Sequence, residues 1–398
     1  MGSRNAVTGG GVPFRARLRS SRWLVAGLWL GACSQGSSRI GASEVGVRAP
    51  DQPASPPPRA FGQAGWERLH AGGVPGRDSP AAGEDAALAC DAARHRVLLY
   101  GGKGDDDVNR NDLWSFDLET RRWTRIVTEG PVPPPCEDHT LVLDEADDQL
   151  VLFGGEDGLT SNATWVFDLR ANRWTDITQD TAPALEGHVA VYDPQGRRMV
   201  VFGGWRVLDK KVKKKKSLEE ATWTLDLHRG SPGYGTWSVL PASDPRPRPR
   251  REHRGVYDPV RHRLIIFGGR QHSSASFLND VWALDLTSQS WREIETRGER
   301  PDPIRQMAFT YDSQANVATV FGGEVRVALD ARDEDRFTVN QIWTLDLESG
   351  LWSDRTPYPR PMYDHVGLFV PDYRGTLVYG GSGDRPGKEH STWLLRLR

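Results

Sequence analysis

Four of the ten histidines occupy the same position of a repeated sequence pattern. Each lies fifteen residues before the first glycine of a Gly-Gly pair, with acidic or basic residues close by in the sequence. The histidines are His139, His188, His253 and His365. The neighbouring charged candidates are Glu186, Glu252, Arg254, Arg305 and Asp364. Titratable groups gathered around one opening would suit a polar or anionic small ligand.

A second candidate site is cationic. Six lysines lie within Lys210–Lys216 and four arginines within Arg246–Arg251, while Trp205 and Arg206 stand just before the lysine segment. Such a patch beside an aromatic ring could hold an acidic polysaccharide, lipid headgroups or an acidic protein segment. The alternative interpretation is a solvated charge run that keeps a surface insertion soluble.

Repeated units of about 55 residues must position both candidates. Six apolar runs each end in a Gly-Gly pair, and in five of them an aspartate stands ten residues before the first glycine. This fixed spacing predicts a β-hairpin in each unit. A tryptophan follows every pair after a loop, and a second tryptophan follows in the first five units, so each unit is expected to hold four strands. These second tryptophans are Trp123, Trp174, Trp237, Trp291 and Trp352.

The units predict an all-β fold, a six-bladed β-propeller with four antiparallel strands per blade, over residues 66–398. The sixth unit lacks a second tryptophan, and Gly65–Leu69, which contains Trp66, has the form of the missing strand. An N-terminal strand would therefore close the ring and remove the open sheet edges. The Gly-Gly and spaced-tryptophan pattern resembles the kelch repeat over residues 66–398.

In a propeller of this kind the first strand of each blade lines a central channel. The loops between second and third strands share a face with the connections between blades, and we call this face the loop face. The distance from Gly-Gly to tryptophan is 11 to 14 residues in four units, but 20 in the third and 21 in the fifth. Long loops on a rigid scaffold are typical positions for binding residues, so the candidate site is expected on this face.

The histidines would begin the inner strands at the loop face. Their competing interpretation is structural, because side chains of a blade point alternately toward its two neighbours and not into the channel. A metal site is not expected, since equivalent positions on different blades lie too far apart to place ligands about 2 Å from one ion. We expect no cofactor.

Composition excludes several classes of function. Lys and Arg number 51 against 53 Asp and Glu, so the chain has no basic field for nucleic acid, and no nucleic-acid partner is expected. Three cysteines cannot form a disulfide framework, and Cys90 and Cys136 are expected at opposite ends of adjacent strands. We expect a monomer.

The N-terminus carries targeting information. Residues 1–32 contain five arginines, no acidic residue and the apolar run Trp23–Leu30, which is typical of a secretory signal. The segment Leu30–Cys33 resembles the bacterial lipoprotein processing site, which implies lipid attachment at Cys33. Residues 33–65 are rich in Ser, Gly, Ala and Pro and are expected to form a disordered tether. The predicted location is the bacterial cell envelope, anchored to a membrane through lipid.

The kelch resemblance implies fold more strongly than function. The leading hypothesis is a membrane-anchored binding scaffold that uses the loop face for a carbohydrate, polyanion or protein partner. The alternative is a sugar-processing enzyme similar to sialic acid mutarotases, with acid and base side chains at the channel mouth. A copper radical oxidase is less favoured, because those enzymes have seven blades and a Cys-linked tyrosine.

Overall fold

The computed structural model describes residues 64–207, 216–241, 244–272, 276–326, 336–355, 361–383 and 388–397. The predicted signal peptide of residues 1–32, the lipidation site Cys33 and nearly all of the predicted tether lie outside the described residues. The same holds for Lys210–Lys215 of the cationic candidate. No helix within the described ranges is long and apolar enough to cross a membrane.

Six four-stranded antiparallel sheets account for most of the described residues. In each sheet the strands follow one another from the inner to the outer edge. The first three sheets are β3 (Ala87–Asp91), β4 (Arg96–Tyr100), β6 (Leu113–Asp117) and β7 (Arg122–Arg125); β8 (Glu137–Asp144), β9 (Gln149–Glu156), β10 (Thr164–Asp168) and β11 (Arg173–Asp176); and β13 (Val189–Asp193), β14 (Arg198–Phe202), β17 (Thr222–Asp226) and β18 (Trp237–Val239). The next three are β19 (Arg254–Asp258), β20 (Arg263–Phe267), β21 (Val281–Asp285) and β22 (Ser290–Glu293); β24 (Ala308–Asp312), β25 (Val317–Phe321), β28 (Ile342–Asp346) and β29 (Trp352–Asp354); and β31 (Val366–Val370), β32 (Gly375–Tyr379), β34 (Thr392–Leu397) and β1 (Ala64–His70).

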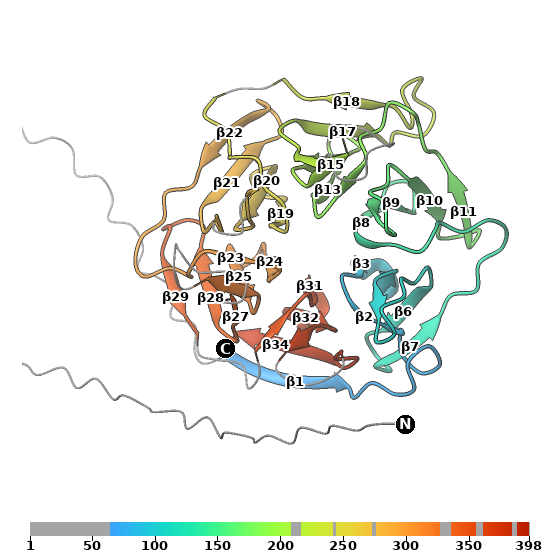
Figure 1. Ribbon diagram of the computed structural model, residues 1–398, viewed down its shortest axis with the longest axis horizontal. Coiled ribbons are helices and arrows are strands. Elements are labelled where there is room, and N and C mark those ends of the chain that lie inside the picture. The colour runs from blue at the N-terminus through green and yellow to red at the C-terminus, as the bar shows by residue number, and fades with distance from the viewer. Residues whose placement is uncertain are drawn as a thin grey trace, which may run out of the picture. The chain divides into compact units, whose positions relative to one another are not determined.

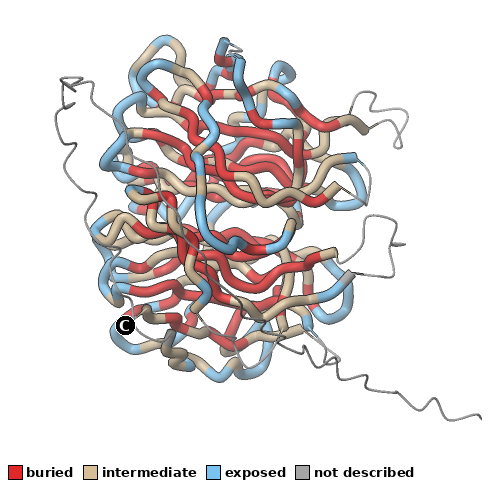
Figure 2. Tube along the Cα trace, turned by 90° about the vertical axis from the view of Figure 1, so that its left-hand side faces the viewer, coloured by how far each residue is buried: buried red, intermediate tan, exposed pale blue. Residues whose placement is uncertain are grey.

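The sheets stand around one axis as the blades of a propeller (Figure 1). Each inner strand contacts the inner strand of the next blade, and β31 contacts β3, so the inner strands form a ring around the axis. The buried residues follow the strands, whereas the connections at both ends of the blades are largely exposed (Figure 2). The predicted all-β propeller is confirmed.

The N-terminal strand β1 completes the last blade. It pairs antiparallel with β34, with Trp66 opposite Leu395, and the two strands lie side by side in Figure 1. This pairing covers the edge that β34 would otherwise expose. Glu67 adds an ion pair of 2.6 Å to Arg396 in β34 and one of 2.7 Å to Arg121 in the first blade.

Aromatic rings join each blade to the one before it. The outer-strand tryptophan of every blade packs against the aromatic residue that precedes Gly-Gly in the preceding blade, with ring centroids 4.4 to 5.3 Å apart. The pairs are Trp66–Phe321, Trp123–Tyr379, Trp174–Tyr100, Trp237–Phe153, Trp291–Phe202 and Trp352–Phe267. The contribution of Trp66 is therefore equivalent to that of the five repeat tryptophans, as expected for aromatic area buried between sheets.

Short additional strands build up the loop face. The connections that enter the inner strands pair with the loops that follow Gly-Gly. These small sheets are β2 (Ala82–Glu84) with β5 (Lys103–Gly104); β12 (Leu185–Glu186) with β15 (Trp205–Val207) and β16 (Lys216–Leu218); β23 (Ile304–Arg305) with β26 (Glu324–Arg326) and β27 (Arg336–Thr338); and β30 (Met362–Tyr363) with β33 (Ser382–Gly383). The two longest loops, in the third and fifth units, thus become hairpins. Two 3₁₀ turns, η1 (Ala92–Arg94) and η3 (Pro371–Tyr373), lie in the opposite hairpin connections.

Candidate functional site: the channel mouth on the loop face

The four repeated histidines lie between blades. None is more than 6% exposed, and His253 and His365 are fully buried. Each ring fills the space that the first glycine of the preceding blade leaves open: a Cβ at Gly203 would lie 2.7 Å from Cε1 of His253. Both glycines of the pair also have positive φ, so the Gly-Gly motif and the histidine form one packing unit.

Burial keeps these histidines neutral. It lowers the pKa of His139 to about 4 and the pKa values of His188 and His365 to about 3, and it lowers that of His253 well below its usual range. Thr140 Oγ1 lies 2.9 Å from His188 Nε2, and His365 Nε2 lies 3.1 Å from the Phe321 carbonyl oxygen. Of the two interpretations left open by the sequence, this environment matches the structural one. Histidine rings buried in this way do not form a titratable ring around the opening.

The residues directly before the repeated positions share one backbone conformation. All six of these residues have left-handed backbone conformations, with φ between 48° and 62°. They are Asp85, Asp138, Gly187, Glu252, Gln306 and Asp364. Five consecutive backbone hydrogen bonds, 2.9 to 3.3 Å long, run from blade to blade through this position, each N–H donating to the carbonyl of the residue before it in the ring. The inner mouth is therefore defined by the backbone, and the side chains at these positions can vary.

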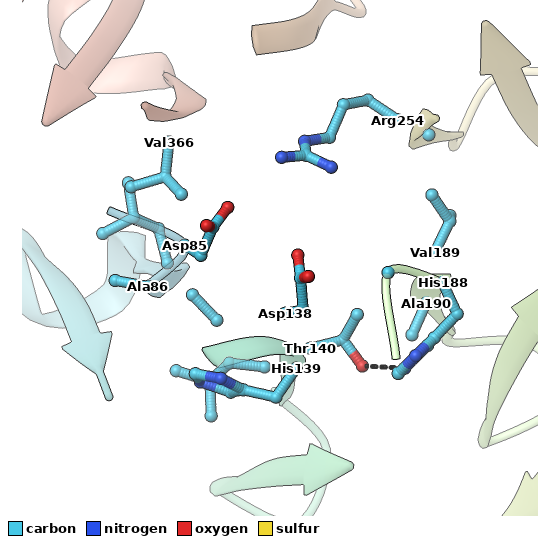
Figure 3. A pocket seen from close by; sticks show the side chains of 15 residues that line it. Asp85, Ala86, Asp138, His139, Thr140, His188, Val189, Ala190, Arg254 and Val366 are labelled. Atoms are coloured by element: carbon cyan, nitrogen blue, oxygen red, sulfur yellow. Dashed lines mark hydrogen bonds between the residues drawn. The ribbon is translucent and has the colours of Figure 1, made fainter. Parts of the chain in front are cut away.

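A pocket of about 160 Å³ lies at this mouth. Figure 3 shows the carboxylates of Asp85 and Asp138 and the guanidinium of Arg254 pointing into it from three inner-strand regions. Val189, Ala190 and Val366 are among the apolar parts of its wall. The pocket therefore combines a charged entrance with aliphatic sides.

Burial, followed by repulsion from neighbouring acids, raises the pKa values of the mouth carboxyls. Burial, followed by the charges of Glu252 and other acids, raises the pKa of Asp138 to about 6. Burial and the charges of neighbouring aspartates raise the pKa values of Asp85 and Asp364 well above their usual range. The guanidinium of Arg254 opposes these shifts at Asp85 and Asp138 without cancelling them.

The acids that surround the mouth already have cationic partners. Glu84 pairs with Lys388 at 2.9 Å, and Glu137 pairs with Lys103 at 2.8 Å. Glu252 is buried among three guanidinium groups: Arg251 at 2.6 Å, Arg270 at 2.8 Å and Arg305. Arg305 also reaches Glu324 at 2.5 Å. The predicted residues Glu252 and Arg305 are thus brought together, but in a buried ion network beside the opening.

Glu186 lies farther out, in β12. Its carboxylate accepts from Thr160 Oγ1 at 2.5 Å and pairs with Lys216 Nζ at 2.7 Å, while Glu156 lies 3.2 Å from the same Lys216. Burial and the hydrogen bond with Glu156 raise the pKa of Glu186 to about 7. Lys216, the part of the lysine run that falls within the described ranges, is therefore held by two carboxyl groups.

Three arginines of the cationic candidate, Arg206, Arg250 and Arg251, are engaged in contacts within the chain. Arg250 is fully buried and makes a two-pronged contact with Asp280, at 2.6 and 2.8 Å. The Arg251 guanidinium lies 4.8 Å from the centre of the Trp205 ring, and Arg206 pairs with Glu219 at 3.0 Å. The charges of Arg206, Arg250 and Arg251 are therefore compensated by neighbouring acids and rings, while the cationic patch as a whole stays a prediction, because Lys210–Lys215 lie outside the described residues.

The repeats and their sheets correspond to a known family of protein domains. The profile of the KLHDC2/KLHL20/DRC7 Kelch-repeats domain matches residues 87–231 and 211–397, well over half of the chain. The chain belongs to the kelch-repeat family. The kelch units of the sequence and the blades of the structure coincide.

Similar kelch proteins occur in several organisms. Host cell factor 2 of Homo sapiens is 26% identical over 323 residues, covering 73% of this chain and 38% of that protein. Putative adagio-like protein 2 of Oryza sativa subsp. japonica is 29% identical over 282 residues, with 67% and 41% covered. Kelch domain-containing protein 2 of Bos taurus is 28% identical over 333 residues, with 75% and 78% covered. The chain thus spans about two fifths of the length of the first two relatives.

The solved structure of a protein called YjhT has a similar fold. It matches with a TM-score of 0.60 and 15% sequence identity, covering 81% of this chain and 97% of the other. At this identity the likeness concerns the kelch propeller fold alone.

Sequence reasoning selected Asp364 for the candidate site but did not name Asp85. The available sign was positional: acids stand directly before the repeated position in four of the six kelch units. This sign is weaker than that of the histidines, because one residue type recurs at the repeated position whereas Asp, Gly, Glu and Gln stand before it. Among the described residues no group of three or more His, Cys, Asp or Glu side chains could hold a metal ion, and Cys90 and Cys136 are free.

Proposed function

We propose that this kelch protein is a scaffold, anchored to a membrane of the bacterial envelope through lipid at Cys33, that binds a protein partner on the loop face. A kelch propeller supports a protein-binding scaffold role. The observation that carries the proposal is the concentration of binding features on one face: the channel-mouth pocket and two hairpins, β15–β16 and β26–β27, lie there. The opposite face carries the short turns that join the first and second strands of each blade.

Exposed apolar side chains support a protein partner. Val108, Leu159 and Phe337 are at least half exposed, and all three belong to loops between the second and third strands of a blade. Exposed apolar side chains on the loops of one face are available for contact with a protein partner. The pocket is also smaller than the roughly 300 to 1,000 Å³ typical of small-molecule sites, which favours a single inserted side chain over an enclosed sugar.

Photo-crosslinking in cells tests this proposal. A photoreactive amino acid at Leu159 or Phe337 should give a discrete crosslinked protein adduct. The matched control is Val260, which is exposed in the turn between β19 and β20 on the opposite face. Equal crosslinking from Val260, or no adduct from either loop-face position, would contradict the scaffold proposal.

A further inference from the structure

We propose that the channel mouth binds the cationic side chain of a lysine or arginine that the protein partner inserts along the propeller axis. This inference rests on the proposed scaffold function and names the group that the mouth recognises. It is carried by the placement of three neighbouring aspartates, two of which direct their carboxylates into the pocket, by the buried oxygens of Asp364 and Asp85 that have no hydrogen-bond partner, and by the aliphatic wall of the pocket.

Asp85, Asp138 and Asp364 are equivalent residues of three blades. The shared left-handed conformation directs the carboxylates of Asp85 and Asp138 into the pocket (Figure 3), and Asp364 adopts the same conformation with a φ of 54°. The Asp364 carbonyl accepts the Asp85 N–H at 3.2 Å, which places the two residues side by side. The three acids therefore form a continuous arc across blades six, one and two.

One carboxylate oxygen of Asp364 lacks a hydrogen-bond donor. Asp364 is 8% exposed, and its buried Oδ1 has no hydrogen-bond partner. Oδ1 of Asp85 is likewise buried without a partner. Buried carboxylate oxygens in this condition are costly, and an ammonium or guanidinium group would supply the missing donors together with the missing charge.

The net charge of the groups that face the pocket also favours a cationic ligand. Arg254 is the guanidinium that points into the pocket together with Asp85 and Asp138, so two carboxylates face one cation there. Glu84, Glu137 and Glu252 stand next to them, but they are already paired with Lys388, Lys103 and the arginines around Glu252. One additional positive charge would bring these pocket groups to neutrality.

Pocket size and lining indicate a side chain. A volume of about 160 Å³ suits a group of side-chain size. Ala86, Val189, Ala190 and Val366 provide apolar contacts for the methylene stem that lysine and arginine carry behind their charged heads. A compact inorganic cation would make no use of this wall.

The titration of the arc gives a pH signature. The mouth aspartates must ionise to attract a cation, and each is influenced by the others, by Glu84, Glu137, Glu252, Arg251 and Arg305 at the rim, and by Arg254 across the pocket. With the pKa of Asp138 at about 6, binding of a cationic probe should strengthen between pH 5 and pH 8. Lysine and arginine keep their charge throughout this interval.

The test measures binding of blocked amino acids to the full chain by NMR line broadening or calorimetry. Nα-acetyl-lysine amide and Nα-acetylarginine amide are the probes, and Nα-acetylnorleucine amide is the neutral control of similar shape. We expect saturable binding of at least one cationic probe at pH 8, at least about tenfold tighter than the control, a difference of about 1.4 kcal/mol. Equal binding of the neutral control would overturn the proposal.

Variants with opposite expected effects separate a binding role from a folding role. Asp364→Asn and Asp138→Asn should each weaken probe binding about five- to tenfold, whereas Arg254→Gln should strengthen it, because repulsion of the incoming cation is removed. Asp302→Asn is the matched control, since Asp302 is exposed in the connection before β23 and contributes no group to the pocket. Unchanged or weaker binding by a folded Arg254→Gln variant would contradict the proposal even if an aspartate variant fails to fold.

Two further comparisons complete the test. The first distinguishes a free amine from a side chain of the partner as the source of the cation, and the second distinguishes failure of the cation proposal from failure of the scaffold proposal. n-Butylamine binding much more tightly than the blocked lysine would identify a free-amine site and overturn the assignment to a partner side chain. If neither probe binds while Leu159 still crosslinks a partner, the cation proposal fails and the scaffold proposal stands. If probes bind and no crosslink forms, the scaffold proposal fails.

Discussion

His365 of the sixth blade occupies the space in front of Gly322 of the fifth blade. A Cβ added to Gly322 would lie 2.6 Å from Cε1 of His365 and 2.7 Å from the Met362 carbonyl oxygen. Equivalent contacts join His139 to Gly101 and His188 to Gly154. Each blade boundary of this type therefore depends on a residue without a side chain on one side and a flat ring on the other.

Gly322→Ala should lower the free energy of unfolding by more than about 2 kcal/mol, because it combines a left-handed backbone with a clash against a ring and a carbonyl. Gly230→Ala is the control, since Gly230 also has positive φ but has no atom within 4 Å of an added Cβ. Urea denaturation followed by tryptophan fluorescence measures both. Equal losses of unfolding free energy in the two variants would mean that backbone strain alone explains the requirement for glycine at position 322.

His365→Met should be tolerated, because Met307 occupies the same repeat position in the fifth blade and is fully buried. The loss at pH 7.5 should stay below about 1.5 kcal/mol, whereas His365→Ala should cost about 2 to 4 kcal/mol through the cavity it leaves. Chemical denaturation of the two variants checks this ranking.

The same pair gives a pH prediction. The folded-state pKa of His365 is lowered to about 3, so the unfolded chain takes up a proton below about pH 6.5 while the folded protein does not. The stability contributed by the neutral ring is complete above pH 6.5 and is lost as the pH falls toward 3. His365→Met should therefore gain on the parent by about 2 kcal/mol between pH 7.5 and pH 5. A constant difference across this interval would show that His365 takes up a proton in the folded protein as readily as in the unfolded chain.

Asp138→Asn should act with the opposite sign. The folded-state pKa of Asp138, at about 6, lies above its unfolded value, so its ionised form costs stability fully above pH 6 and not at all below about pH 3.8. The variant should be more stable than the parent by about 1 to 2 kcal/mol at pH 7.5 and equal to it at pH 4, where Asn also suits the left-handed backbone. Melting curves at both pH values, with Asp302→Asn as a control, measure the effect.

Deleting residues 60–72 should lower the thermal midpoint by about 10 °C or more and promote aggregation, because the edge of β34 becomes free and Phe321 loses Trp66. Deleting residues 34–58 should change neither property. Calorimetry and light scattering compare the two truncations, and similar behaviour of both would contradict the structural role of β1.

Cys33→Ser should abolish membrane attachment if Leu30–Cys33 is a lipoprotein processing site. Intact-mass analysis of the membrane-extracted parent should show a diacylglyceryl group on a chain that begins at Cys33. A soluble, unmodified parent beginning at another residue would end this proposal.

Sequence spacing predicted the blades well, because each depends on local repeated features: Gly-Gly after an apolar run, aspartate at the hairpin turn, and tryptophan on the outer strands. The pairing of Trp66 with the last blade was predictable for the same reason. The charge state of the channel mouth could not be predicted in this way. It depends on which acids find cationic partners across blades, such as Glu84 with Lys388, and residues 304 positions apart carry no sign of this contact in their local sequence.

The ring of left-handed residues at the mouth limits which amino acids can stand there. Branched side chains such as Val, Ile and Thr are strongly disfavoured at positive φ, whereas Asp, Asn and Gly tolerate it. The mouth is thereby biased toward flexible or polar residues before any ligand is considered, and Asp, Gly, Glu and Gln are the types present. The hydrogen-bonded backbone fixes six positions at the mouth, and only a few residue types suit them. Single substitutions among these types would let related propellers change the ligand that they recognise without changing the structure of the blades.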